Sequence, residues 1–163
     1  HLVGDGASGE VRSVSYAGRG QHQETEAKMV HAAPNTSSKV VSKSISQQSG
    51  TTPYRCLVRV DEDATQAASV LSCEALLLDE QSVSLTPPDL KIAEEDARIT
   101  HDTNVSKIDD VQLFYLMSRG LSAEQAMGLI VNGFIEPVTQ TLPMEYAVEW
   151  NRLIELQMAG SVG

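Results

Sequence analysis

The sequence predicts a mainly β fold followed by a short helical region, and three observations support this. Residues 1–108 consist of short apolar or alternating segments separated by polar or Gly/Pro-rich breaks. No helical pattern lies between these segments, so βαβ crossovers are not expected. After residue 108 the apolar residues recur every three or four positions, as they do on one face of a helix.

The expected strands follow one another at fairly regular intervals. They lie at 11–16, 28–33, 39–46, 54–60, 70–78, 82–85, 89–92 and 98–107. Two architectures suit this pattern, a sandwich or barrel and a solenoid of parallel β-coils. Short strands rich in Ser, Thr and Asn, with few aromatic residues, favour the solenoid.

The first two helices have recognisable start signals. Asp109 or Asp110 is a plausible N-cap for a helix that stops at Gly120. Ser122 opens the second helix, and Gln125 three residues later has the spacing of a capping box. The pattern therefore predicts two consecutive helices joined by a short turn.

The second helix is expected to end at Gly133 and Pro137, and a third to run from about Pro143 to residue 159, with Gly160 as its C-cap. A helix-turn-helix DNA reader would need basic or amide side chains on its second helix. Residues 122–134 contain no Arg or Lys, and Glu124 adds negative charge. A packed helical hairpin is the favoured interpretation.

Composition narrows the function classes. The 163 residues carry a net charge of −10 and only 4% aromatic residues, which disfavours nucleic-acid and anionic-membrane partners. Two cysteines without a disulfide framework suit a cytoplasmic protein. No apolar run is long enough for a membrane helix, and no signal peptide is visible. Because the chain begins with His1, we interpret it as a fragment of a longer protein.

Cys73 lies inside the apolar segment SVLSCEALLLDE. Side chains alternate in a strand, so Cys73 shares a face with Leu71 and Ala75, which by itself predicts a buried thiol. Cys56, in YRCLVRV, has the same interpretation.

Other residue types give weaker signals. His22, His31 and His101 lack the close spacing of metal ligands, so each is expected at the surface or hydrogen-bonded in the core. A carbohydrate-cleaving β-helix would use clustered carboxylates. The acidic runs 61–63 and 94–96 fall in expected turns, where charge is usually just solvated.

Eight stretches, spread in order over the whole chain, resemble the SufB/SufD family of iron–sulfur cluster assembly proteins, and its SufB branch in particular. They are KMVHAAPNTSS (28–38), SKSIS (42–46), YRCLV (54–58), SCEALL (72–77), ARITHDTNVSKI (97–108), DDVQLFYLMSRGLS (109–122), LIVNGF (129–134) and LPMEYAVEWNRL with the ending GSVG (142–163).

The resemblance implies a right-handed parallel β-helix followed by a small C-terminal helical domain. Residues 1–108 would be the C-terminal part of the β-helix core domain, and 109–163 the helical domain. Members of the family are non-catalytic scaffolds that assemble with an ATPase, SufC, and a paralogue, SufD, and receive sulfur from a desulfurase system. SufC would dock on residues 109–159. Consistently, the chain has no phosphate-binding loop.

The resemblance also implies a site. The family's functional cysteine falls on Cys73, and the acidic residue of a His-Glu motif falls on Asp102, beside His101. Cys73 and Asp102 would bind iron or sulfur at a subunit interface, with His101 as a further candidate. Strand alternation predicts that only one of Asp102 and His101 faces inward. The cluster would be transient and would not be retained by this fragment.

Three departures from the family bear on the ligand set. Asp102 stands where Glu is usual, Thr100 replaces a residue that is often acidic, and the segment 82–87 lacks the thiol, imidazole or ring found in many members. Cys56 stands where Gly is usual. The leading interpretation is an iron–sulfur assembly scaffold, and the alternative is a purely structural relative that binds the ATPase without building clusters.

Overall fold

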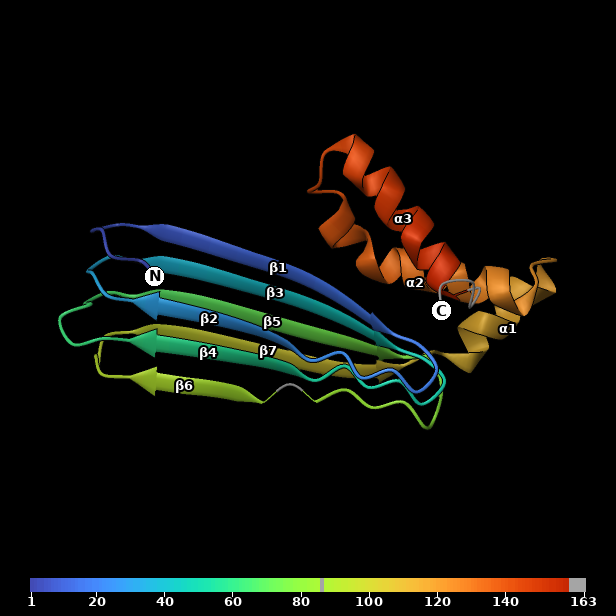
Figure 1. The fold of residues 1–163 in the computed structure, drawn as a ribbon, viewed down its shortest axis with the longest axis horizontal. Coiled ribbons are helices and arrows are strands. Elements are labelled where there is room, and N and C mark those ends of the chain that lie inside the picture. Colours follow the sequence, from blue (N-terminus) through green and yellow to red (C-terminus); the bar gives the residue numbers. More distant parts are fainter. Residues whose placement is uncertain (86, 159–163) are drawn as a thin grey trace.

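The computed structural model describes residues 1–85 and 87–158, and the side chains of residues up to 156. Seven strands form two parallel sheets that are wound into a β-helix of about three turns (Figure 1). The four-stranded sheet has the order β1 (Ser8–Ala17), β3 (Ser37–Ser46), β5 (Ala68–Leu77), β7 (Arg98–Lys107). The three-stranded sheet has the order β2 (Thr25–His31), β4 (Tyr54–Val60), β6 (Pro88–Ile92). The predicted solenoid is confirmed.

Each turn of the solenoid places one strand in each sheet. The arrowheads in Figure 1 show that β1, β3, β5 and β7 run towards the end that carries the helices, whereas β2, β4 and β6 run back. All strand pairings are parallel and in register, so residues about one coil apart stack on each other. Inner and outer faces can therefore be followed as rows across a sheet.

The inner core lies between the two sheets. Val40, Leu71 and Cys73 from the larger sheet pack there against Cys56 and Val58 from the smaller one. These side chains are at most 2% exposed. Strand alternation explains the packing, because every second residue of β3, β4 and β5 points inward.

Carboxylates on one coil hold the turns of the preceding coil. Asp79 accepts hydrogen bonds from the backbone N–H of Gln48, and Glu94 accepts from that of Asp63. Both donors have positive φ, 52° for Gln48 and 66° for Asp63, so the carboxylates stabilise turns that are uncommon for residues with a side chain. Asp96 does the same for Gln66 at 3.0 Å.

One expected strand is absent. Instead of a strand at 82–85, the structure has a single isolated bridge between Thr51 and Val83. Asp79 accepts hydrogen bonds from the backbone N–H groups of Gln81 and Ser82, at 2.8 and 2.9 Å. These bonds fold the start of the segment into a turn, so the prediction of a strand there is wrong.

Three helices follow the solenoid: α1 (Asp110–Ser118), α2 (Ala123–Thr139) and α3 (Met144–Met158). The start signals are confirmed. Asp109 accepts from the N–H of Val111, and Ser122 and Gln125 form the reciprocal capping box. Gly120, with φ of 97°, ends α1. The predicted C-cap Gly160 lies outside the described residues.

The predicted end of α2 is wrong. The helix continues through Gly133 and Pro137 to Thr139. Pro137 opposes the continuation, because its ring clashes with the backbone carbonyl of Gly133 and it cannot donate a helix hydrogen bond. Burial of Ile135 and Val138 nevertheless favours continuing the helix.

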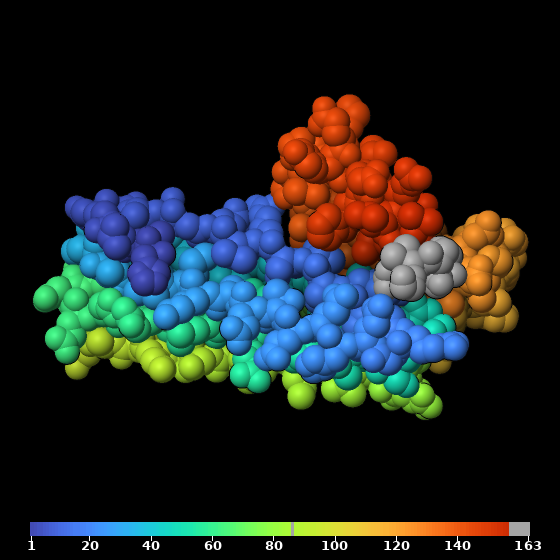
Figure 2. Space-filling model, viewed as in Figure 1, coloured from blue at the N-terminus to red at the C-terminus, as the bar shows by residue number. Residues whose placement is uncertain are grey.

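Helix α2 covers part of the outer face of the larger sheet. Its Val131 and Ile135 pack with Tyr16, Ile45 and Leu76 in a second buried cluster. Figure 2 shows the helices rising from one end of the solenoid, with α1 extending beyond it. Within the described part of the chain, no helix is both long enough and apolar enough to cross a membrane.

Candidate functional site

Cys73 points into the interior of the solenoid. It lies on β5, is 2% exposed and belongs to the inner core cluster. Its inner row across the larger sheet consists of Ser13, Ser42, Cys73 and Thr103. Burial raises the pKa of the Cys73 thiol, because the low-dielectric interior disfavours the thiolate. The thiol is therefore protonated at neutral pH.

The register decides which of the two neighbouring candidates shares a face with Cys73. His101 pairs with Leu71, whereas Asp102 pairs with Ser72. Leu71 and Cys73 both face inward, so His101 lies on the inner face of β7 and Asp102 on the outer face. The sequence preference for Asp102 as the companion of Cys73 therefore differs from the geometry of this chain, in which His101 is the companion.

Strand β7 is the last strand of its sheet, and its inner face is partly open. His101 is half-buried, and its Nε2 lies 2.8 Å from Oγ1 of Thr103. Thr103 and Asp102 are exposed. Cys73 is thus one strand back from the open end of the solenoid, and His101 and Thr103 line that end.

The open end continues along the smaller sheet. All five residues of β6 are exposed, including Leu90 at 41% and Ile92 at 45%. Val105 on β7 is 46% exposed. No strand pairs with the free edges of β6 and β7 among the described residues. Exposed apolar side chains next to unpaired backbone groups are typical of an edge that another chain covers.

Three further residues of the interior were not singled out by the sequence analysis as a group: Cys56, Tyr54 and Ser13. Burial, and then the nearby Cys73, raise the pKa of Cys56 to about 11. Burial also raises the pKa of Tyr54 to about 12, and both cysteines are close enough to raise it further. The alternation in YRCLVRV, which puts Tyr54 and Cys56 on one face, could have indicated this neighbourhood.

The hydroxyls of Tyr54 and Ser13 have no hydrogen-bond partner, although both oxygen atoms are buried. Ser13 is near enough to lower the pKa of Tyr54, but the effect of burial outweighs it, and the two groups do not meet hydrogen-bond geometry. Buried polar groups are nearly always paired, so two orphans in one interior call for an explanation.

The other histidines are structural. His31 is fully buried, with Nδ1 2.8 Å from Oγ1 of Thr36 and Nε2 2.9 Å from Oγ of Ser38. Burial lowers its pKa. His22 is exposed and lies 2.6 Å from Oγ1 of Thr51. Across residues 1–85 and 87–158, no three His, Cys, Asp or Glu side chains are gathered closely enough to hold a metal ion.

On the outer face of the larger sheet, a buried cation lies behind the Cys73 row. Lys43 is 5% exposed, its Nζ atom is 2.9 Å from Oε2 of Glu74 and 4.5 Å from the ring centroid of Phe134 on α2. Since Glu74 follows Cys73 directly in β5, the same strand contacts the inner site and, through Lys43, the helices.

Comparison with known proteins assigns the family. The family described as "SUF system FeS cluster assembly, SufBD core domain" matches residues 1–134. Over 162 residues the chain is 54% identical to an iron–sulfur cluster assembly SufBD family protein of Mycobacterium tuberculosis and 52% identical to the iron–sulfur cluster assembly protein SufB of Bacillus subtilis. These matches cover 99% of this chain, but 19% and 35% of the two relatives, so the chain spans about a fifth to a third of their length. The chain belongs to the SufBD family.

Proposed function

We propose that this chain is part of a scaffold on which iron–sulfur clusters are assembled, with Cys73 as the residue that accepts sulfur and binds iron. One observation carries the proposal: Cys73 lies in an inner row one strand from the open end of the solenoid, with His101 on the same face of the last strand. The family and the names of the relatives supply the reaction class.

The chemistry suits a temporary site. A thiolate is a natural ligand of iron and an acceptor of persulfide sulfur, and an imidazole or carboxylate can complete a labile iron site. Cys73 would act with His101 from the inner face. Asp102 lies on the outer face of β7 and would join the site only after that edge strand rearranges against a partner. Fewer thiolates than the four of a stable cluster favour release of the product. The cluster is thus cargo of the scaffold.

The open end of the solenoid is the proposed subunit interface. Leu90, Ile92 and Val105 supply exposed apolar area beside unpaired strand edges. A SufD-type paralogue or a second copy of the chain would continue the sheets there and add ligands to the site. Sulfur would come from a desulfurase system.

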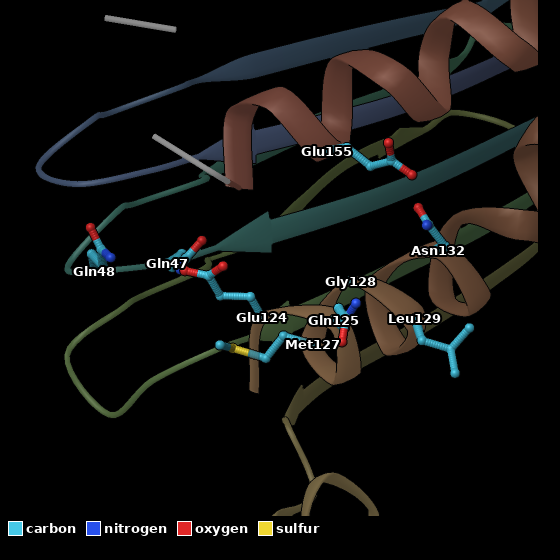
Figure 3. A pocket seen from close by; sticks show the side chains of 9 residues that line it. All are labelled: Gln47, Gln48, Glu124, Gln125, Met127, Gly128, Leu129, Asn132 and Glu155. Atoms are coloured by element: carbon cyan, nitrogen blue, oxygen red, sulfur yellow. The ribbon is translucent and has the colours of Figure 1, made fainter. Parts of the chain in front are cut away.

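The C-terminal helices are the proposed docking surface for a SufC-type ATPase, which would carry the ATP hydrolysis. Helix α1 buries none of its residues, and Val111 and Phe114 on it are 76% and 73% exposed. A cavity of about 520 Å³ lies between the turn after β3 and helices α2 and α3 (Figure 3). Gln47 and Gln48 line it from the turn, Asn132 from α2 and Glu155 from α3.

The role of Cys73 is tested by Cys73→Ala in the full-length protein with its partners. We expect loss of the iron–sulfur absorption that develops under anaerobic assembly and of growth that depends on the clusters. Cys56→Ala is the matched control, since Cys56 is equally buried in the same cluster. Unchanged cluster formation in the Cys73 variant would reject the proposal.

Docking of the ATPase is tested by Phe114→Ser, which leaves the fold intact because α1 packs none of its side chains in the core. Val3→Ser is the control, because Val3 is 74% exposed on the solenoid. Weakened ATPase binding by the first variant alone supports the assignment, and equal binding by both variants contradicts it.

A structural subunit that holds the ATPase without building clusters is the second candidate. The observation that favours it is the burial of Cys73, whose thiol is protonated in the closed solenoid. Under this alternative, Cys73→Ala leaves cluster formation by the complex unchanged, whereas Phe114→Ser still loses the ATPase.

A further inference from the structure

The inner core contains hydrogen-bonding capacity that the fold does not use. Tyr54 is 2% exposed, and its hydroxyl and that of Ser13 are buried without partners. Even a hydrogen bond between them would leave one O–H proton without an acceptor. Leaving a buried donor unsatisfied costs about 1–3 kcal/mol, so a fold selected only for stability would favour phenylalanine at position 54.

Both hydroxyls lie in the interior that contains Cys73. Ser13 belongs to the same inner row as Cys73, two strands away. Tyr54 comes from the opposite sheet and packs in the same buried cluster as Cys73, and its hydroxyl lies near Ser13. All of these groups except Ser13 belong to one apolar cluster with Met29, Val40 and Val58, which excludes water from them.

We propose that the hydroxyl of Tyr54 is a hydrogen-bond donor to sulfane sulfur carried on Cys73, and that Ser13 positions the Tyr54 hydroxyl by donating to its oxygen. This inference rests on the proposed function, and it assigns positioning residues to the same site. A terminal persulfide sulfur is an anion one S–S bond beyond Sγ, and so it reaches deeper into the interior than the thiol does. Donors that are fixed in a dry interior stabilise such an anion more strongly than water-exposed donors would.

Transfer of sulfur from polysulfide to Cys73 needs no added oxidant or reductant. The Cys73 thiol first gives its proton to a second polysulfide anion. The thiolate then attacks the terminal sulfur of an inorganic polysulfide, the Cys73 S–S bond forms, and the polysulfide S–S bond breaks. The polysulfide leaves one sulfur shorter and with its two negative charges, and Cys73 becomes an anionic persulfide. The transferred sulfur keeps the sulfane oxidation level.

The test measures how long Cys73 retains that sulfur. The full-length protein is treated anaerobically with inorganic polysulfide, desalted, and alkylated after increasing times. Mass spectrometry of the peptides then gives the persulfide on Cys73 separately from any on Cys56. We expect Tyr54→Phe to shorten retention at Cys73 roughly tenfold, the usual effect of removing a hydrogen bond to a charged group. Ser13→Ala should act in the same direction.

Tyr16→Phe is the matched control. Tyr16 is also buried, at 7% exposure, but its hydroxyl donates to Gln47 outside the inner core. It should retain sulfur as the unsubstituted protein does. Melting temperatures give a second readout: Tyr54→Phe should melt at the same or a higher temperature, because it removes an unpaired hydroxyl, whereas Tyr16→Phe should melt lower.

The possible outcomes distinguish the role inferred for the two hydroxyls from the role proposed for Cys73. Normal retention in both Tyr54→Phe and Ser13→Ala overturns the inference and leaves the role of Cys73 in place. Equal losses in Tyr54→Phe and Tyr16→Phe overturn it as well. If Cys73 takes up no sulfur even in the unsubstituted protein, the inference and the proposed function are both overturned.

Discussion

The Nζ atom of Lys43 lies 2.9 Å from Oε2 of Glu74, and this ion pair sits between the outer face of the solenoid and the ring of Phe134. Lys43 is nearly buried, whereas Glu74 is 38% exposed. The pair therefore fastens α2 to the strand that carries Cys73. Lys43 thus connects α2 to that strand through one ion pair and one ring contact.

Replacing Glu74 by Gln should loosen α2, because it leaves the buried ammonium group of Lys43 without its counter-charge. We expect a loss of roughly 1–2 kcal/mol, less than for a fully buried pair because Glu74 is partly solvated. Hydrogen exchange of the α2 amides in the full-length chain measures this loss of stability. Lys107→Gln, which breaks an exposed ion pair with Glu80, should leave exchange unchanged. Similar effects of the two substitutions would contradict the fastening role.

Acidification should lower the stability of the folded protein, because His31 is buried. Burial lowers its pKa from the ordinary value of 6.5, so on acidification the unfolded chain takes up the proton before the folded one does. The contribution is complete above about pH 6.5 and is lost below it, with a slope of at most about 1.4 kcal/mol per pH unit. Urea unfolding between pH 8 and pH 5 checks this. His31→Gln should flatten the slope, and an unchanged slope would assign the acid sensitivity to other groups.

Gly50→Ala should disrupt the turn between β3 and β4. A Cβ atom at this position would lie 2.3 Å from the carbonyl oxygen of Ala17, which is backbone and cannot move aside without distorting β1. We expect a loss of more than about 3 kcal/mol in thermal unfolding. Gly4→Ala is the control, since a Cβ there meets nothing within 4 Å. Near-equal melting temperatures would mean that the turn relaxes.

Ile92→Lys should weaken association at the open end of the solenoid. The substitution puts a charge on an edge strand, which opposes strand pairing with another chain. Ile92 is 45% exposed, and Val70, 46% exposed on β5, offers a matched control as Val70→Lys. Sedimentation of the full-length protein, alone and with the proposed SufD-type partner, should show weaker association for Ile92→Lys only. Equal behaviour would place the interface elsewhere.

Local patterns predicted much of the fold. Strands 39–46, 54–60 and 98–107 show clear alternation, and the two N-caps use side chains close in sequence. The failures involve distant partners. The segment after Asp79 looks extended, but that carboxylate folds it into a turn, and α2 runs past Gly133 because its next residues are buried on the sheet.

Some features of the candidate site can be predicted from the local sequence, and others depend on distant strands. Burial of Cys73 follows from the alternation of its own strand. Alternation also predicts that His101 and Asp102 face opposite ways, but it does not say which one faces inward. That depends on the register between β5 and β7, which pairs Leu71 with His101. The interior neighbours Tyr54 and Cys56 come from the other sheet, so no spacing rule within one strand brings them to Cys73.

The carboxylates that accept hydrogen bonds from the turns determine the order in which successive coils of the solenoid can be completed. The turn at Gln48 takes its acceptor from Asp79, 31 residues later, and the turn at Asp63 takes its acceptor from Glu94, again 31 residues later. During synthesis on the ribosome, each coil therefore emerges with its turn unfinished and is locked only when the next coil has been made. A nascent solenoid of this kind always has one loose coil at its growing end.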